Sequence, residues 1–260
     1  MPLMKAFSLK HLSDFRSIAE SILTDAEREE LLKNIHFFYA PDSASYQSIQ
    51  DHSEYVDTIL GFHINEIELN LKSTAQILQP DGNVSTWGRQ MHEGSQSWVG
   101  LNPRQLLTPY HELLEMCRLL NPKAGTTLID LGAGYARMAF VLNQYEPLAK
   151  FIGYEIVEER VTESNRLLKH YELSDSVMIA QDLSSKSFSL PVADFYLLYD
   201  YGNVEHIKST LNDLKNIAFK HPIKVIGRGR MRGLIDNDHA WLSQVFEPIH
   251  CETFSLYSSF

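Results

Sequence analysis

An alternation of short apolar strands and amphipathic helices, which begins near residue 109, constrains the fold of this chain more than any other feature. Strands are predicted over TTLIDL (126–131), AKFIGYEI (149–156), SVMIAQD (176–182), DFYLLYD (194–200) and IKVIGRG (223–229), and helices over residues 110–120, 136–144, 158–171 and 204–220. Strands separated by helices pair in parallel through right-handed crossovers. The pattern therefore predicts a doubly wound, mostly parallel α/β sheet that binds its ligands at the carboxyl ends of the strands. Since the last segment lacks room for another crossover, ETFSLYSS is predicted to form an antiparallel closing strand.

The first hundred residues predict a helical region that ends in an irregular loop. Thr24 and Glu27 have the spacing of a capping box, which predicts a helix through about Phe37. The apolar residues Val56, Leu60, Ile64, Ile67 and Leu71 predict a second amphipathic helix. Residues 79–108 are rich in Gly, Ser, Asn and Pro and carry Trp87 and Trp98, which is typical either of a loop that folds over a site or of a linker whose aromatic residues dock on the core. We expect an N-terminal helical region with a substrate or lid loop over residues 1–105 and a ligand-binding domain over residues 106–260.

The charge and composition exclude some partners and leave others open. The formal net charge is −10, from 33 acidic and 23 basic residues, which argues against a nucleic-acid partner but is compatible with a small molecule or a lysine- or arginine-rich protein segment. The two cysteines have no zinc-like spacing, and His63 with Glu66 is better read as a polar helix face than as a metal site, so no metal is expected. Without a secretory signal pattern or an apolar run of membrane-spanning length, a cytoplasmic protein is expected, with its oligomeric state left open.

A glycine turn follows the first strand of the alternating region. In Asp130-Leu131-Gly132-Ala133-Gly134 the glycines let the backbone approach a ligand closely, and the following helix offers free amides. The third glycine of a dinucleotide-binding loop is replaced by Arg137. A carboxylate at Asp130 suits a ligand with an ammonium group better than a pyrophosphate.

Two further acids end the next two strands. Glu155 can accept hydrogen bonds from both hydroxyls of a ribose, a role shared by nicotinamide and methyl-donor sites. Asp182 can accept a hydrogen bond from the exocyclic amine of an adenine. Each acid alone would be read as an ordinary solvated residue, but three acids at the ends of three successive strands favour one binding site.

With these residues the chain resembles the class I S-adenosylmethionine-dependent methyltransferases, whose doubly wound sheet has seven strands. The resemblance covers residues 105–260 and implies a Rossmann-like methyltransferase fold with S-adenosyl-L-methionine as cofactor. It assigns cofactor binding to Asp130, Gly132, Ala133 and Gly134 as the first motif, to Glu155 at the ribose, and to Asp182 and Leu183 at the adenine.

Within that family the chain is most similar to the protein-lysine methyltransferases that lack a SET domain. The similarity rests on Thr108, which precedes Asp130 by about one helix and would contact the methionine part of the cofactor, and on ADFYLLYDYGNVEHIKSTL, which resembles their fourth strand and the helix after it. The chain differs from that branch at Arg137 and in the turn that follows the fourth strand. The resemblance implies methyl transfer to an amine, and a protein lysine side chain is the leading acceptor.

The end of the fourth strand lies beside the transferable methyl group in this fold, which makes Tyr199, Asp200 and Tyr201 the candidate catalytic residues. Asp200 would orient the acceptor nitrogen or accept its proton. Alternate strand residues point to opposite faces, so at least one tyrosine is expected in the core.

Other readings stay open. A small-molecule methyltransferase could enclose its substrate under the N-terminal helices, and a noncatalytic module could use the fold only to bind a partner. A nicotinamide-dependent oxidoreductase is disfavoured by Asp130 and Arg137. A methyltransferase that acts on nucleic-acid bases is also disfavoured, because the DYGN turn lacks the two prolines typical of those enzymes. Arg228, Arg230 and Arg232 either bind an acidic substrate group or are solvated turn residues, the latter being favoured.

Overall fold

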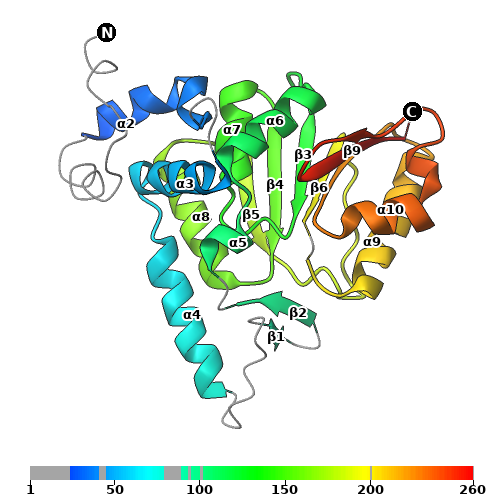
Figure 1. Cartoon of the computed structure of the whole chain (residues 1–260), viewed down its shortest axis with the longest axis horizontal. Coiled ribbons are helices and arrows are strands. Elements are labelled where there is room, and N and C mark those ends of the chain that lie inside the picture. Colours follow the sequence, from blue (N-terminus) through cyan, green and yellow to red (C-terminus); the bar gives the residue numbers. More distant parts are fainter. Residues whose placement is uncertain are drawn as a thin grey trace.

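The computed structural model describes residues 24–40, 45–78, 89–92, 95–99, 102–199 and 201–259. Its centre is a seven-stranded sheet in the order β5-β4-β3-β6-β7-β9-β8 (Figure 1). The strands are β3 (Thr127–Leu131), β4 (Lys150–Glu155), β5 (Ser176–Ala180), β6 (Phe195–Tyr199), β7 (Lys224–Arg228), β8 (Ile249–His250) and β9 (Phe254–Ser258). The first five of these strands are parallel, whereas β9 runs antiparallel to both β7 and β8. The predicted doubly wound, mostly parallel α/β sheet and its antiparallel closing strand are confirmed.

Helices cover both faces of this sheet. α6 (Tyr110–Leu120), α7 (Arg137–Tyr145) and α8 (Glu158–His170) pack on one face, and α9 (Val204–Ala218) and α10 (Met231–Asp238) pack on the other. Strand side chains alternate between the two cores: Phe195 and Leu197 of β6 face the first group of helices, and Tyr196 and Leu198 face the second. Both faces are buried, which explains why the central strands are continuous apolar runs.

The region before α6 is mainly helical. It contains α2 (Asp25–Leu32), the 3-10 helix η2 (Ile35–Phe38), α3 (Tyr46–Leu60), α4 (Ile64–Leu78), the antiparallel hairpin of β1 (Arg89–His92) and β2 (Ser95–Trp98), and α5 (Pro103–Leu106). The predicted capping box between Thr24 and Glu27 is present. The domain boundary predicted between residues 105 and 106 falls within α5.

Two helix predictions for this region need correction. The first helix ends at Leu32 and not near Phe37, because a separate 3-10 turn follows it. The apolar repeat from Val56 to Leu71 is not one helix but the end of α3 and the start of α4. Gly61 caps α3 with φ of 79°, a left-handed conformation that ends the helix.

The N-terminal helices are joined to α7 and α8 by buried polar contacts. Arg137 of α7 pairs with Asp57 of α3, and Arg160 of α8 pairs with Glu68 of α4. Figure 1 shows α3 and α4 beside α8, and α5 with the β1–β2 hairpin at the end of the sheet where β3 and β4 terminate. No helix in the described part of the chain is long and apolar enough to cross a membrane.

Candidate functional site

The loop after β3 turns on two glycines in left-handed conformations. Gly132 has φ of 86° and Gly134 has φ of 55°, values that residues with a Cβ rarely adopt. A Cβ on Gly132 would also lie 2.9 Å from the Cβ of Tyr201. The amides of Gly132 and Ala133 both donate to the carbonyl of Tyr154, each at 2.9 Å. The loop is thereby tied to the end of β4, close to the switch in strand order between β3 and β6.

Asp130 places a buried carboxylate at the bottom of the pocket that this loop borders. Its residue exposure is 8%, and it lines the pocket. Within the described ranges, no residue donates a hydrogen bond to this carboxylate or forms an ion pair with it. Burial, and to a smaller extent the charge of Glu155, raise the pKa of Asp130 to about 7. A cation in the pocket would compensate this charge.

Glu155 ends β4 and faces the same pocket. Its carboxylate accepts the amide of Gly134 at 3.0 Å through one oxygen, and the amides of Ile156 and Val157 at 2.9 and 3.0 Å through the other. Glu155 is 6% exposed, and Arg160 lies 3.7 Å from it. The side chain is therefore held in one orientation at the junction of the glycine loop and α8.

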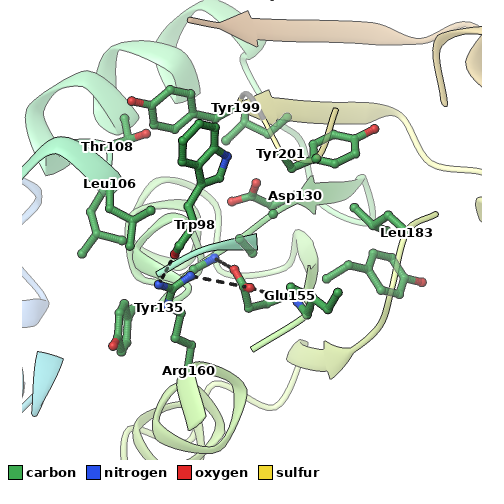
Figure 2. A pocket seen from close by; sticks show the side chains of 18 of the residues that line it. Trp98, Leu106, Thr108, Asp130, Tyr135, Glu155, Arg160, Leu183, Tyr199 and Tyr201 are labelled. Carbon is green, nitrogen blue, oxygen red and sulfur yellow. Dashed lines mark hydrogen bonds and ion pairs between the residues drawn. The ribbon is translucent and has the colours of Figure 1, made fainter. Parts of the chain in front are cut away.

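Asp182 and Leu183 follow β5 and form another part of the pocket wall. The Asp182 carboxylate accepts two hydrogen bonds from Ser184, one from its amide at 2.8 Å and one from its hydroxyl at 2.6 Å. This turn orients Asp182, and Figure 2 shows Leu183 on the side of the pocket opposite Thr108.

Thr108 is held through its backbone by Arg137. The guanidinium donates to the Thr108 carbonyl at 3.0 Å and binds both carboxylate oxygens of Asp57. Arg137 is only 6% exposed, and its hydrogen bonds connect α7 with α3 and with the segment before α6. The residue that replaces the third glycine of a dinucleotide loop thus shapes the pocket wall.

The structure brings all eight predicted cofactor-binding residues to one pocket. They are Thr108, Asp130, Gly132, Ala133, Gly134, Glu155, Asp182 and Leu183. Two of the three predicted catalytic residues, Tyr199 and Tyr201, line it as well. Asp200 lies outside the described residues.

The two tyrosines differ in their surroundings. The Tyr199 hydroxyl donates to the Gln105 carbonyl at 3.2 Å, and the Arg228 guanidinium carbon lies 4.3 Å from the centre of its ring. Tyr201 is 8% exposed and packs in the core beneath α9. Burial raises the pKa of its phenol, so the hydroxyl stays protonated near neutral pH.

Several pocket residues were not identified from the sequence as site residues. Tyr135, Arg160 and His206 line the pocket, and so does Trp98 from the predicted loop. Figure 2 shows the Trp98 indole between Tyr199 and Asp130, with its backbone carbonyl turned to Arg160. Trp87 lies outside the described residues. No local sequence pattern identifies Arg160 or Tyr135 as a site residue, because the partner that both share, Glu68, lies far away in the chain.

The arginines at and after the end of β7 are not solvated turn residues as a group. Arg228 is 9% exposed and pairs with Glu112 at 2.9 Å. Arg230 donates to the Gly202 carbonyl at 2.7 Å, and only Arg232 has a half-exposed side chain. In the described part of the chain, no group of three or more His, Cys, Asp or Glu residues is placed to hold a metal ion.

No protein-family model and no curated protein matches this sequence. Similar solved structures include an RNA methyltransferase from Salinibacter ruber in complex with S-adenosyl-L-homocysteine, at 17% identity and a TM-score of 0.43, covering 58% of this chain and 91% of that one. A precorrin-6Y C5,15-methyltransferase from Geobacter metallireducens is similar at 11% identity and a TM-score of 0.47, covering 59% and 89%.

An S-adenosylmethionine-dependent methyltransferase from Aquifex aeolicus is similar at 13% identity and a TM-score of 0.45, covering 61% of this chain and 97% of that one. Similarities this distant carry no argument about activity or substrate. The strand order, the parallel pairing and the antiparallel β9 give the described chain a Rossmann-like methyltransferase fold.

Proposed function

We propose that this protein is a class I methyltransferase that uses S-adenosyl-L-methionine to methylate an amine, with a protein lysine side chain as the leading acceptor. The observation that carries the proposal is the buried Asp130 carboxylate, which faces the pocket without a partner among the described residues. An ammonium group supplies the compensating charge, and the cofactor carries one on its methionine part.

The other residues of the pocket fit the remaining parts of the cofactor. Gly132 and Gly134 leave the loop without side chains where the ligand approaches. Glu155 keeps two fixed carboxylate oxygens at the pocket wall for the ribose hydroxyls, and Asp182 with Leu183 would hold the adenine. Thr108 would contact the methionine part from the opposite wall.

When bound, the cofactor would supply a methyl group on a sulfonium, and a nucleophile would attack the methyl carbon in line as the thioether leaves. The C–S bond would break as the N–C bond forms, and the amine would lose a proton to water or to a nearby base. The chain's task is to hold a neutral amine along that axis. We assign this task to the end of β6, where Asp200 would orient the nitrogen and Tyr199 and Tyr201 would border it.

The N-terminal region would form the rest of the acceptor site. Trp98 and α5 contribute to the pocket wall, which supports a substrate or lid role for residues 1–105. Because Trp98 partly encloses the pocket, a small-molecule methyltransferase is the second candidate. A nicotinamide-dependent enzyme is disfavoured, since a pyrophosphate at the glycine loop would meet the Asp130 carboxylate, and Arg137 replaces the third glycine of a dinucleotide-binding loop.

Ligand-induced thermal stabilisation tests the cofactor assignment. A ligand that binds only the native state raises the melting temperature, so S-adenosylhomocysteine is expected to stabilise the protein and nicotinamide nucleotides are not. Stabilisation by nicotinamide nucleotides alone would refute the assignment.

The acceptor class needs a separate experiment. The protein is incubated with cofactor labelled in the methyl group and with a cell lysate divided into macromolecules and metabolites. Label in protein that hydrolyses to methylated lysine supports the leading acceptor. Label confined to metabolites supports the second candidate, and tight cofactor binding without transfer to either fraction supports a noncatalytic module.

A further inference from the structure

Arg160 lines the pocket and makes three hydrogen bonds, yet it belongs to no motif found in the sequence. It is 2% exposed, and its Nε and Nη2 donate to the two carboxylate oxygens of Glu68 at 2.8 and 3.1 Å. Its Nη2 also donates to the backbone carbonyl of Trp98 at 2.6 Å, and its Nη1 lies 3.7 Å from Glu155. One guanidinium thus joins α4, α8, the end of β4 and the end of β2.

The contact with Trp98 places an aromatic side chain over the pocket. Trp98 lines the pocket together with Asp130 and Tyr199, and Figure 2 shows its carbonyl on Arg160 while the indole reaches in the opposite direction, toward Asp130. The hydrogen bond to the carbonyl thus holds the backbone from which the indole extends over the pocket. Tyr135 supports this arrangement, because its hydroxyl donates to Glu68 at 2.8 Å.

We infer that Arg160 is a positioning residue for the cofactor, which acts by fixing Glu155 on one side and by latching Trp98 over the pocket on the other. The inference rests on the proposed function. It gives a role to Arg160 and Trp98, neither of which belongs to the glycine loop. It also implies that release of the cofactor requires the Arg160–Trp98 hydrogen bond to open.

The shape of the guanidinium matters more to this role than its charge. An ammonium at this position could pair with Glu68 or Glu155, but it lacks the planar fork that reaches Glu68 and the Trp98 carbonyl together. Arg160→Lys therefore keeps the positive charge among the buried acids but removes the hydrogen bond to the Trp98 carbonyl.

Arg166 offers a control on the same helix. Its Nη2 donates to the backbone carbonyl of Gly61 at 2.6 Å, and its Nε donates to Glu163 at 2.8 Å. Arg166 also ties α8 to the N-terminal helices, but it is not among the pocket residues. Arg166→Lys removes a link between α8 and the N-terminal helices without touching the site, at a more exposed position, since the Arg166 side chain is 44% exposed and that of Arg160 is 3% exposed.

The test measures S-adenosylhomocysteine binding and Trp98 accessibility in a Trp87→Phe/Trp241→Phe background, which leaves Trp98 as the single tryptophan of the three in the chain. Arg160→Lys is expected to weaken binding about 10-fold or more, mainly through faster dissociation, because a charged hydrogen bond is lost. Acrylamide should quench Trp98 more strongly in the ligand-free Arg160→Lys variant than in its parent. Arg166→Lys should match the parent in both measurements.

Each outcome has a distinct meaning. If the parent binds S-adenosylhomocysteine and Arg160→Lys binds it equally tightly, the inference is overturned. If the parent does not bind it at all, the proposed function fails, and quenching of the ligand-free proteins still tests the latch. Should Arg160→Lys fail to fold, Trp98→Ala takes its place, with Arg160 intact. About 10-fold faster dissociation of S-adenosylhomocysteine from Trp98→Ala would support the role of Trp98 over the pocket. An unchanged dissociation rate would overturn it.

Discussion

Asp130 illustrates how a single residue ties stability to ligand binding. Its pKa is raised to about 7 from an ordinary value near 3.8, with burial as the main cause. The proton that it holds stabilises the folded state below about pH 4, and this stabilisation is lost as the pH rises through about 7. Above that pH the ligand-free protein carries an ionised, uncompensated carboxylate in its pocket.

Asp130→Asn is therefore expected to stabilise the ligand-free protein while it abolishes tight ligand binding. At pH 8 the free energy of unfolding should exceed that of the wild type by roughly 2 kcal/mol, and the difference should shrink toward pH 5. Urea denaturation at several pH values measures it. S-adenosylhomocysteine should bind at least about 30-fold more weakly, because its ammonium loses a buried partner.

The pH dependence of binding provides the internal control. The wild type should bind S-adenosylhomocysteine more tightly at pH 8 than at pH 6, since the ionised form of Asp130 increases over that range. In Asp130→Asn this dependence should largely disappear. An Asp130→Asn variant with unchanged affinity would show that the carboxylate does not bind the ligand.

The residues that sequence reasoning identified are those whose position follows from local pattern. Asp130, Glu155 and Asp182 stand at strand ends, and parallel strands bring their carboxyl ends to one edge of a sheet. Arg137 and Arg160 could not be assigned in this way, because their partners Asp57 and Glu68 lie 80 and 92 positions away in the chain. Buried ion pairs between distant elements leave no periodic signal.

The α3–α4 junction shows why one apolar repeat predicts a single helix where the chain forms two. Val56 and Leu60 lie at the end of α3, and Ile64 and Leu71 lie in α4, so helical spacing continues across the break. Gly61 is the local signal of the turn, and its φ of 79° confirms that role. The alternating strands and helices of the second half were predictable because each unit is short and bounded by turn residues.

Gly61→Ala tests this reading of the junction. The substitution forces a Cβ into a left-handed conformation and should lower the free energy of unfolding by about 1 kcal/mol. Gly233→Ala is the matched control, because Gly233 lies inside α10 with open space around the position of a Cβ. It should raise stability by about 0.5–1 kcal/mol. Equal effects of the same sign in denaturant unfolding would contradict the assigned conformations.

The ion pairs that α3 makes with Arg137 and with Arg104 predict different costs when they are broken. Asp57 is buried with Arg137, whereas Asp51 and Glu54 both pair with Arg104, whose side chain is 28% exposed. Asp57→Asn leaves a buried guanidinium undercompensated and should destabilise the fold by about 3 kcal/mol. Arg104→Met should cost about 1 kcal/mol or less. Thermal and urea unfolding of the two variants measures the contrast, and a reversed order would show that the Asp57–Arg137 pair is not the main clamp on α3.

The fold places one pocket that fits the proposed cofactor, but it leaves the choice of acceptor to surface features. The net charge of −10 attracts cationic partners over distances of several ångströms, and salt screens such attraction. The ammonium of the cofactor would be paired in a buried site, where screening is weaker. Salt should therefore weaken the binding of a cationic acceptor more than it weakens the binding of the cofactor.

If the acceptor is a lysine-rich protein segment, the KM for a lysine-rich peptide should rise about threefold or more between 50 and 500 mM salt. The dissociation constant of S-adenosylhomocysteine should change by less than about twofold over the same range, because Asp130 is shielded from solvent. Methyl transfer at several salt concentrations, with ligand binding measured in parallel, checks both expectations. A small amine whose pKa lies below the assay pH, and which is therefore uncharged, serves as the acceptor control, since its KM should not depend on salt. Faster transfer to the small amine, with no salt dependence for the peptide, would instead favour the small-molecule reading, in which Trp98 encloses the substrate rather than bordering a groove for a protein.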